Sequence, residues 1–451
     1  MALIKHDGIG YKGNGLQLLL KHNITVGDNI MITTVDDEEI SGVLMPRYES
    51  ANKDHIVIKL KSGYNTGIRL ENIKQITKLE KDKHAALPGV RPAKDYETLQ
   101  RSNLPRIALI STGGTIASKI DYRTGGVHAA LTAAELYSSV PELANYASID
   151  PEVLLSEYSE NITPAHWTQI AEKVAEKVKM GRYSGIVISH GTDTMHYTAA
   201  ALSFALQDLP IPVVLVGAQR SSDRPSSDAA LNLLGATIFA SKSEYAGVFI
   251  AMHASTSDDA ITCHIGTRVR KNHTSRRDAF ESIDTAPIAL IKNGIIEMQK
   301  NEINLSKRRS DNNINAKTKF DDRVVLLKYY PGFNPKLITN IISSGNKIII
   351  FEGTGLGHIS RECFPALQEA IHAGIIVCMA SQCIWGRVRM TVYDTGRDLL
   401  MIGVIPLSDM ISETATVKAM WVLANSKQED IKKIMQENIA NEISSSIPIQ
   451  K

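Results

Sequence analysis

Residues 185–202 read GIVISHGTDTMHYTAAAL and join an apolar run, a polar turn and the start of a helical pattern. The run GIVIS is short, continuously apolar and β-branched, which is typical of a strand covered on both faces. Thr192, Asp193 and Thr194 follow His190 in the turn. A helix N-cap needs only one such side chain. Capping is the simpler interpretation of the turn, but three capping types in succession favour a functional site.

The same alternation of strand and helix patterns continues on both sides of this stretch. From residue 106, apolar β-like runs such as IALIS, VLLSEYS, PVVLVG and AGVFIAM alternate with helical stretches. A second, smaller set begins at residue 323 with VVLLKYY, KIIIFEG and IIVCMAS. Strand–helix alternation predicts βαβ units and a parallel sheet. We therefore expect a larger doubly wound parallel α/β domain followed by a smaller α/β domain.

The chain before residue 106 has a different pattern. Short apolar runs with β-branched residues and Gly/Asn/Asp turn signals fill residues 24–79, which predicts a small β-barrel or sandwich. The expected domain organisation is a β-barrel, a linker, the larger domain, a charged linker, and the smaller domain with a surface helix over 426–446. The corresponding boundaries are 1–80, 81–105, 106–305, 306–322 and 323–451.

Composition excludes several classes of protein. The 451 residues carry a formal net charge of +2, so the whole chain has no basic excess that would favour nucleic acid. The four cysteines lie far apart without a CxxC pair, which suits reduced thiols better than a disulfide framework or a zinc site, and no metal ligand set is expected. We see no cationic leader and no apolar run of roughly 18 residues that could span a bilayer. These features predict a cytoplasmic protein.

Two further segments could carry chemistry. STGGTIAS (111–118) follows a predicted strand, but its glycine spacing fits neither GxGxxG nor GxxxxGK[ST]. Taken alone, it is most often a structural turn. Lys271 lies in the polar stretch TRVRKNHTSRRDAFES (267–282), whose simpler interpretation is a solvated loop. A lysine beside Asp193 and a threonine hydroxyl could instead transfer protons.

The three segments together favour catalysis. A threonine hydroxyl is a weak nucleophile that needs a base partner and donors for the developing oxyanion. The glycine-rich turn, the Thr-Asp turn and the lysine loop supply these parts from separate βα loops. Carboxyl ends of parallel strands are where ligands gather in such sheets, so we expect these segments to meet.

TGGTIAS and HGTDTM, in this order and about 80 residues apart, closely resemble the two signature motifs of the bacterial-type asparaginase/glutaminase family. The resemblance extends over roughly residues 105–425 and includes KNHTSRRDAF and the VGAQR loop. It implies the two-domain α/β fold and hydrolysis of a side-chain amide through an acyl-enzyme.

The resemblance also implies roles for individual residues. Thr115 matches the family's nucleophile, and Tyr122 matches the tyrosine of its mobile loop. Thr192, Asp193 and Lys271 match the second catalytic group.

Four further positions are implied to bind substrate with Asp193: Gly114, Ser159, Glu160 and Gly191. Asp193 should hold the substrate α-ammonium, and Ser159 with Glu160 the α-carboxylate and ammonium. Glu160 stands where many family members carry Gln.

About 105 residues precede the TGGT strand, whereas plain asparaginases begin close to it. This architecture resembles the D subunit family of the archaeal glutamyl-tRNA(Gln) amidotransferases. That resemblance implies a glutaminase that supplies ammonia to a partner E subunit, which converts Glu-tRNA(Gln) to Gln-tRNA(Gln). ATP and Mg would belong to the partner, and this chain would need no cofactor. A homodimer within a heterotetramer is implied, with GTGLGH (353–358) contributing across the subunits.

Other interpretations remain open at this stage. The chain could be a free-standing L-asparaginase with an unrelated extension, or a non-catalytic scaffold that keeps the fold. GTGLGH could indicate a dinucleotide site, but it lacks the full fingerprint. The cluster SKRR (306–309) could touch tRNA phosphates or the partner, although a solvated linker is the simpler interpretation.

Overall fold

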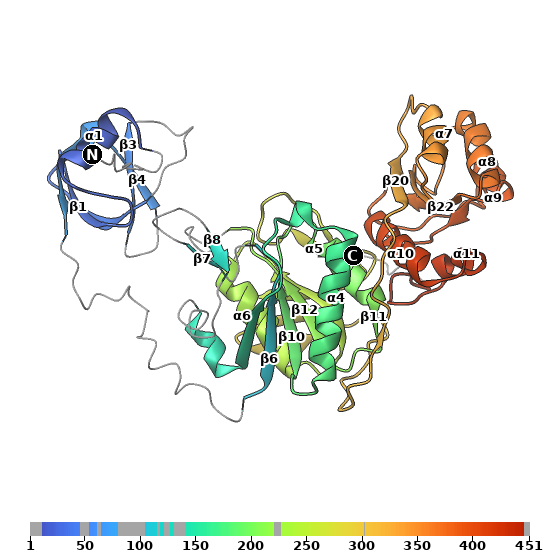
Figure 1. The fold of residues 1–451 in the computed structure, drawn as a ribbon, viewed down its shortest axis with the longest axis horizontal. Helices are drawn as coiled ribbons and strands as arrows, with labels where there is room; N and C mark the ends of the chain where they lie inside the picture. Colours follow the sequence, from blue (N-terminus) through green and yellow to red (C-terminus); the bar gives the residue numbers. More distant parts are fainter. Residues whose placement is uncertain are drawn as a thin grey trace, which may run out of the picture.

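The computed structural model describes residues 11–45, 54–60, 65–79, 104–114, 118–120, 127–129, 140–220, 227–301 and 303–445. Figure 1 shows three successive parts: an N-terminal β module, a central α/β domain and a smaller C-terminal α/β domain. Among the described residues, no helix is long and apolar enough to cross a membrane. The cysteines Cys263, Cys363, Cys378 and Cys383 are all free thiols in this structure.

The N-terminal module is one antiparallel sheet with strand order β4-β3-β2-β1-β5. Its strands are β1 (Asn29–Thr34), β2 (Glu39–Leu44), β3 (His55–Lys59), β4 (Asn65–Arg69) and β5 (Ile73–Lys78). Alternating residues such as Ile30, Ile32, Ile56 and Ile58 are fully buried, so one face of the sheet forms the core. The expected β module is confirmed. It also contains a helix, α1 (Gly13–Lys21), that the strand pattern did not indicate.

The central sheet has eight strands in the order β18-β17-β14-β13-β12-β10-β6-β9. Its first five strands along the chain are β6 (Arg106–Ser111), β9 (Ser148–Val153), β10 (Gly185–Ser189), β12 (Pro212–Val216) and β13 (Gly247–His253). These pair in parallel, as predicted. Three antiparallel strands extend the edge: β14 (Ile261–Ile265), β17 (Ala289–Lys292) and β18 (Ile295–Met298). The sheet is therefore mixed, because after β13 the chain returns by hairpins without crossover helices.

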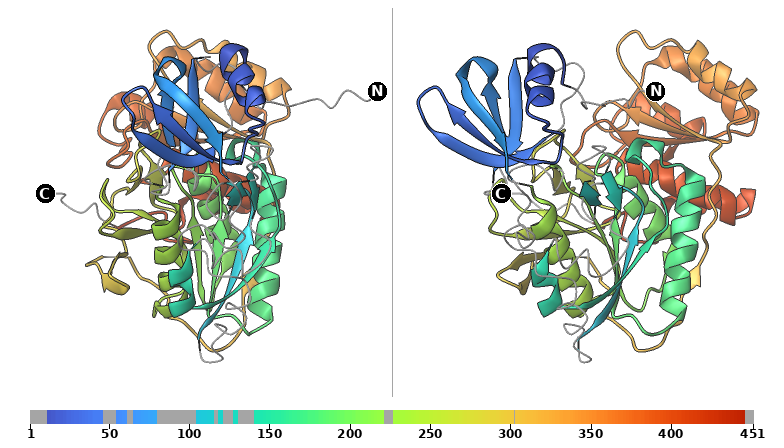
Figure 2. Two further views of the ribbon diagram at one scale, coloured as in Figure 1. Left: turned by 90° about the vertical axis from the view of Figure 1, so that its left-hand side faces the viewer. Right: turned by 60° about the vertical axis from the view of Figure 1, so that its left-hand side comes forward.

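Both faces of the central sheet are covered by helices (Figure 2). Ile107 and Leu109 of β6 pack with Phe239 of α6 (Ala229–Lys242). The intervening residue Ala108 belongs to a second core with α4 (Pro164–Lys179) and α5 (Met195–Ala205). Alternate side chains of one strand thus serve two cores, which confirms the doubly wound arrangement.

The smaller domain is a four-stranded parallel sheet with order β20-β21-β22-β23. Its strands are β20 (Val324–Lys328), β21 (Ile348–Gly353), β22 (Ile376–Ser381) and β23 (Ile405–Pro406). Its helices are α7 (Lys336–Ser343), α8 (Phe364–His372), α9 (Asp394–Met401), α10 (Ser412–Asn425) and α11 (Gln428–Gln436).

The C-terminal tail differs from the predicted surface helix over 426–446. Helix α11 ends at Gln436, and the chain then turns inward. Glu442 is buried and pairs with the buried Lys418 of α10, with Nζ 2.6 Å from Oε1. A buried charge requires a partner, so this pair ties the tail to the domain core.

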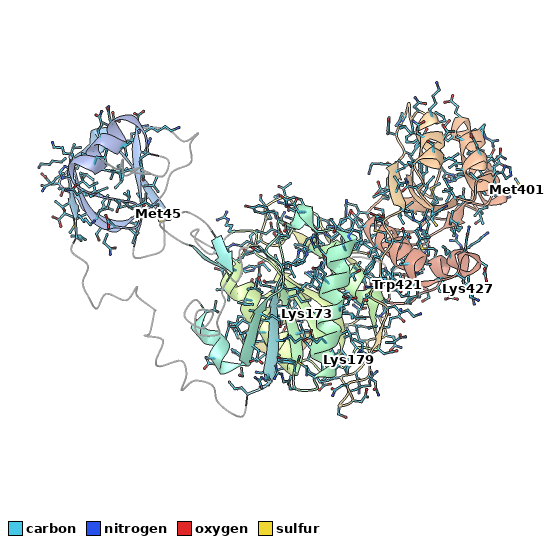
Figure 3. The ribbon with its side chains drawn as sticks, viewed as in Figure 1. Met45, Lys173, Lys179, Met401, Trp421 and Lys427 are labelled. Carbon is cyan, nitrogen blue, oxygen red and sulfur yellow. The ribbon has the colours of Figure 1, made fainter. Side chains whose placement is uncertain are left out.

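The two α/β domains share one hydrophobic cluster around α10. Trp421 of α10 stacks on Phe204 of α5, with ring centroids 5.9 Å apart (Figure 3 labels Trp421). The Trp421 Nε1 also donates to the carbonyl of Lys317 at 2.9 Å. The smaller domain is therefore packed against the helix that follows the HGTDT turn.

The SKRR segment is bound to the larger domain through its arginines. Arg308 donates to the carbonyls of Ser243 at 3.0 Å and Ala240 at 3.1 Å, at the end of α6. Arg309 donates to the carbonyl of Asp208 at 2.8 Å. These guanidinium groups hold backbone carbonyls together, while Lys307 and Arg309 are exposed; contact of this segment with tRNA phosphates or the partner stays a prediction.

Candidate active site

The glycine-rich turn and the HGTDT turn lie side by side at the carboxyl edge of the central sheet. Strands β6 and β10 are parallel neighbours, with Ser111 opposite Ser189. Thr112 binds the Ser189 carbonyl twice, through its backbone nitrogen at 3.0 Å and its hydroxyl at 2.9 Å. Thr112 is buried and committed to this contact, so its role is structural.

Gly114 and Gly191 make the close approach of the two turns possible. Gly114 has φ +76°, and a Cβ there would lie 2.9 Å from the Gly191 nitrogen. A Cβ on Gly191 would lie 2.8 Å from the Cβ of Ser159. The three predicted substrate-binding positions therefore meet at one point, with no room for larger side chains between them.

Thr115 and Tyr122, the expected nucleophile and its assisting tyrosine, lie outside the described residues. Their roles stay predictions. Gly114, the last described residue before Thr115, lies against the HGTDT turn.

Thr192, Asp193 and Lys271 form a hydrogen-bonded group. The Lys271 Nζ lies 2.9 Å from the Thr192 Oγ1 and 2.5 Å from the Asp193 Oδ1. The lysine side chain is nearly buried, whereas that of Asp193 is 67% exposed. Such an arrangement can pass a proton between the ammonium and a hydroxyl, while the open carboxylate remains available to a cationic ligand group.

Lys271 reaches this group from a short β ribbon. Strand β15 (Val269–Lys271) pairs with β16 (Phe280–Ser282), placing Lys271 opposite Phe280. Val269 and Phe280 are buried in the second core of the central domain. The KNHTSRRDAF segment is thus anchored at its base, and the solvated-loop interpretation does not fit Lys271.

Ser159 and Glu160 lie on a single helical turn, η3 (Ser159–Asn161), beside the HGTDT turn. Ser159 is buried, and its carbonyl accepts a hydrogen bond from the Thr194 hydroxyl at 2.6 Å. Glu160 is exposed. The structure brings both predicted residues to the site, and Thr194 acts as the link that joins the two segments.

A buried hydrogen-bond chain beneath the HGTDT turn is absent from the sequence-based expectations. Trp167 Nε1 lies 3.1 Å from Thr198 Oγ1, and Thr198 Oγ1 lies 2.9 Å from His190 Nε2. The other ring nitrogen of His190, Nδ1, lies 2.7 Å from the Gly191 carbonyl. Only one assignment satisfies every group: the indole donates to the hydroxyl, the hydroxyl to Nε2, and Nδ1–H to the carbonyl.

His190 is consequently a neutral structural support. Burial lowers its pKa to about 4, and the Gly191 carbonyl opposes that shift only in part. His190 stands in the signature motif, but its partners lie outside that motif: Thr198 follows in the next helix, and Trp167 comes from an earlier one.

The loop after β12, which begins VGAQR, is held by a second buried network. The Asp228 carboxylate accepts hydrogen bonds from the backbone nitrogens of Gln219 and Arg220, both at 2.9 Å. Asn232 donates to Asp228 at 2.9 Å, and its side-chain oxygen lies 2.6 Å from His253 Nδ1. The base of this loop is therefore fixed beside the site.

GTGLGH (353–358) belongs to the smaller domain, where it follows β21 as a tight turn closed by Thr354 and His358. Its expected contribution to a neighbouring subunit stays a prediction. In the parts of the chain that the structure covers, no group of three or more His, Cys, Asp or Glu side chains could hold a metal ion.

Comparison with known proteins identifies three matching family models. They are "Asparaginase, N-terminal" over residues 106–304, "Glutaminase/Asparaginase C-terminal domain" over 323–435, and "GatD N-terminal domain" over 24–79. The third match covers the β module that plain asparaginases lack.

Full-length relatives carry the same architecture. The D subunit of the glutamyl-tRNA(Gln) amidotransferase of Pyrococcus abyssi is 48% identical over 434 residues, covering 95% of this chain and 97% of the relative. The Thermofilum pendens protein of the same name is 44% identical over 441 residues, covering 96% of each.

The chain belongs to the family of glutamyl-tRNA(Gln) amidotransferase D subunits. The D subunit is one part of a complex with other subunits. Among solved structures, the thermostable L-asparaginase of Thermococcus kodakarensis is 34% identical with a TM-score of 0.66 and covers 76% of this chain and 100% of its own. The L-asparaginase I of Vibrio cholerae is 28% identical with a TM-score of 0.65, at 76% and 99% coverage. The family and fold expected from the two motifs are confirmed.

Proposed function

We propose that this chain is the glutaminase component of a tRNA-dependent amidotransferase and that it uses the threonine site described above. The observation that supports this most strongly is the contact of Lys271 with Thr192 and Asp193, at 2.9 and 2.5 Å. Residues about 80 positions apart supply a hydroxyl, a carboxylate and an ammonium in one place. A protein that served only as a scaffold would have no use for this group.

The proposed reaction has two steps. The Thr115 oxygen attacks the side-chain amide carbon of glutamine and its hydroxyl proton is passed on, while the C–N bond breaks and ammonia leaves with an added proton. The resulting glutamyl ester is then attacked by water, which releases glutamate and restores the hydroxyl. Lys271 and Thr192 would relay protons in these steps, and Asp193 would hold the α-ammonium of the substrate.

The remaining partners follow from the family's chemistry. An E subunit would take the ammonia and convert Glu-tRNA(Gln) to Gln-tRNA(Gln), using ATP and Mg bound to itself. This chain would act as a homodimer within a heterotetramer, in the cytoplasm. Its near-balanced charge supports contact with tRNA mainly through the partner.

A free-standing L-asparaginase is the main alternative, because the solved asparaginases match the two α/β domains. The N-terminal match over 24–79 and the nearly complete coverage of the amidotransferase relatives favour the amidotransferase.

The direct test measures hydrolysis of glutamine and asparagine by the purified chain, with and without the E subunit and Glu-tRNA(Gln). We expect glutamine to be hydrolysed and the ammonia to appear in Gln-tRNA(Gln) when the partner is present. Strong asparaginase activity that neither the E subunit nor the tRNA alters would contradict the proposal. Thr115→Ala is the control that separates site-specific hydrolysis from contamination.

A further inference from the structure

Strand β15, which carries Lys271, is only three residues long, so its position depends on what holds its ends. Side chains alternate along a strand, and Val269 therefore shares a face with Lys271 while Arg270 points to the opposite side. Val269 is buried in the central domain. Arg270 is directed toward the smaller domain, where it binds a carboxylate.

Three successive contacts join the approach to β15 with the start of α10. The Thr414 hydroxyl donates to the Thr267 carbonyl at 2.9 Å. Arg268 binds the Asp409 carboxylate at 2.9 Å, and both side chains are almost completely buried. Arg270 Nε donates to the Glu413 Oε1 at 2.6 Å. The smaller domain thus holds the chain at positions 267, 268 and 270, immediately before the lysine.

Glu413 is suited to act as a fixed anion. It is 7% exposed and lies in the first turn of α10, where the helix dipole favours negative charge. Burial by itself would raise its pKa, but Arg270, the backbone N–H of Glu413 and His196 together hold the pKa below its ordinary value. The Ser412 hydroxyl lies 3.2 Å from the other carboxylate oxygen.

Glu413 also acts electrostatically on His196, a buried residue of the helix that follows the HGTDT turn. His196, in the first turn of α5, is buried, and its Nδ1 has no hydrogen-bond partner in the described chain. Burial lowers the pKa of His196 to about 4; Glu413 opposes that shift, whereas Arg270 and Lys271 add to it. Glu413, Arg270, His196 and Lys271 therefore form one electrostatic cluster across the domain boundary. Its ionisable neighbours include Tyr197, Glu352, His190 and Asp193.

We propose that Glu413 is a positioning residue for Lys271 and acts through its ion pair with Arg270. The smaller domain would then set the place of the proton-transferring lysine without touching the substrate. This inference rests on the proposed function, because it assigns Lys271 to proton transfer in amide hydrolysis. The inference adds that the rate of proton transfer depends on how the smaller domain packs against the larger one.

The expected effect follows from geometry. Without the Glu413 carboxylate, Arg270 is left unpaired at the domain boundary, and β15 loses its own side-chain contact with the smaller domain. A misplacement of roughly 1 Å in a catalytic group can cost on the order of 100-fold in rate. Substrate affinity depends on other residues, so kcat should fall while KM changes little.

The test compares E413Q, E413D, R270Q and the double variant E413Q/R270Q in the full chain. The matched control is E172Q, because Glu172 pairs with Lys319 at 2.9 Å, also between the larger domain and the segment that leads to the smaller one. We expect E413Q and R270Q each to lower kcat by about 10- to 100-fold. The double variant should be no worse than either single one, E413D should recover part of the rate, and E172Q should match the wild type.

A second measurement reports on Lys271 without using activity. Acetic anhydride acylates the free amine of a lysine, and mass spectrometry gives the acylation rate of Lys271 at fixed pH. Loss of this contact would loosen β15 and expose the nearly buried amine of Lys271, so E413Q should acylate Lys271 at least about threefold faster than wild type. Arg270 is partly exposed, so R270Q keeps the test decisive if E413Q fails to fold.

The two measurements separate two kinds of failure. If wild-type chain hydrolyses neither amide, the proposed function fails, while the acylation rates still decide whether Glu413 positions Lys271. Unchanged acylation together with a kcat within twofold of wild type in E413Q would overturn the inference. Equal losses of kcat in E413Q and E172Q would overturn the inference as well, because the loss would then follow from any broken ion pair between the domains and would not be specific to Glu413.

Discussion

The Lys271 Nζ lies 2.9 Å from the Thr192 Oγ1, although 79 residues separate them in the chain. Thr192 stands at the carboxyl end of β10, and Lys271 ends the short ribbon strand β15. The contact links the second signature motif to a polar segment that carries no signature of its own.

Lys271→Met should remove the ammonium from this contact and keep most of the side-chain volume. We expect glutamine turnover to fall by roughly 10²- to 10⁴-fold, which is the usual loss for an acid or base group. Lys319→Met, at a 67% exposed position, is the matched control and should leave turnover unchanged. Steady-state kinetics decides, and full turnover in Lys271→Met would remove the lysine from the mechanism.

Gly114→Ala should separate the two turns that form the site. The added Cβ would lie 2.9 Å from the backbone nitrogen of Gly191, which cannot move as a flexible side chain could. Gly345→Ala introduces the same strain, at φ +82°, with no atom within 4 Å. Each change costs about 1 kcal/mol for the backbone conformation, so any extra loss in Gly114→Ala measures the clash. We expect lost hydrolysis for Gly114→Ala only, and a larger fall in its urea midpoint than in that of Gly345→Ala; equal effects would contradict the close approach.

Thr198→Val tests the buried chain below the HGTDT turn. The variant keeps the shape of the side chain but leaves His190 Nε2 without its donor and Trp167 Nε1 without its acceptor. An unsatisfied buried polar group costs about 1–3 kcal/mol. Urea unfolding should show a loss of this size, whereas Thr391→Val, at an exposed position, should change stability by less than about 0.5 kcal/mol. If the two variants lose the same stability, the chain does not support the turn.

Lys418→Met tests the corrected position of the C-terminal tail. It would leave Glu442 charged, buried and unpaired, which costs about 3–5 kcal/mol. The exposed pair of Lys433 and Glu437, 3.6 Å apart, provides the control variant Lys433→Met, with an expected cost below about 1 kcal/mol. Urea unfolding measures both, and the double variant Lys418→Met/Glu442→Gln should recover part of the loss. A tail helix lying on the surface would make Lys418→Met harmless.

Local sequence patterns were enough to predict that the HGTDT and STGG segments lie close together. GIVIS and IALIS are buried parallel strands, so HGTDT and STGG had to emerge at the same edge of the sheet. Lys271 was a candidate from the residues alone, but its segment has the composition of an ordinary loop, and the family resemblance was needed to favour a catalytic role over a solvated one.

Other features depend on distant partners that a local pattern does not contain. The antiparallel strands β14, β17 and β18 are as apolar and short as parallel ones, and only their pairing distinguishes them. Glu442 and Arg308 are charged residues in polar segments, which normally face solvent. Glu442 is buried because it pairs with Lys418, and Arg308 is partly buried because it binds a carbonyl of α6. The His190 support required Trp167 and Thr198, from two different helices, to be placed together in space.

The identity of the nucleophile tests the central claim most directly. The complex with the E subunit and Glu-tRNA(Gln) can be mixed with glutamine, quenched in acid within milliseconds and digested for mass spectrometry. The account predicts a glutamyl ester on the peptide that contains STGGTIAS, with fragmentation placing the added mass on Thr115. An ester on Thr192, or none on this chain while ammonia is released, would contradict it.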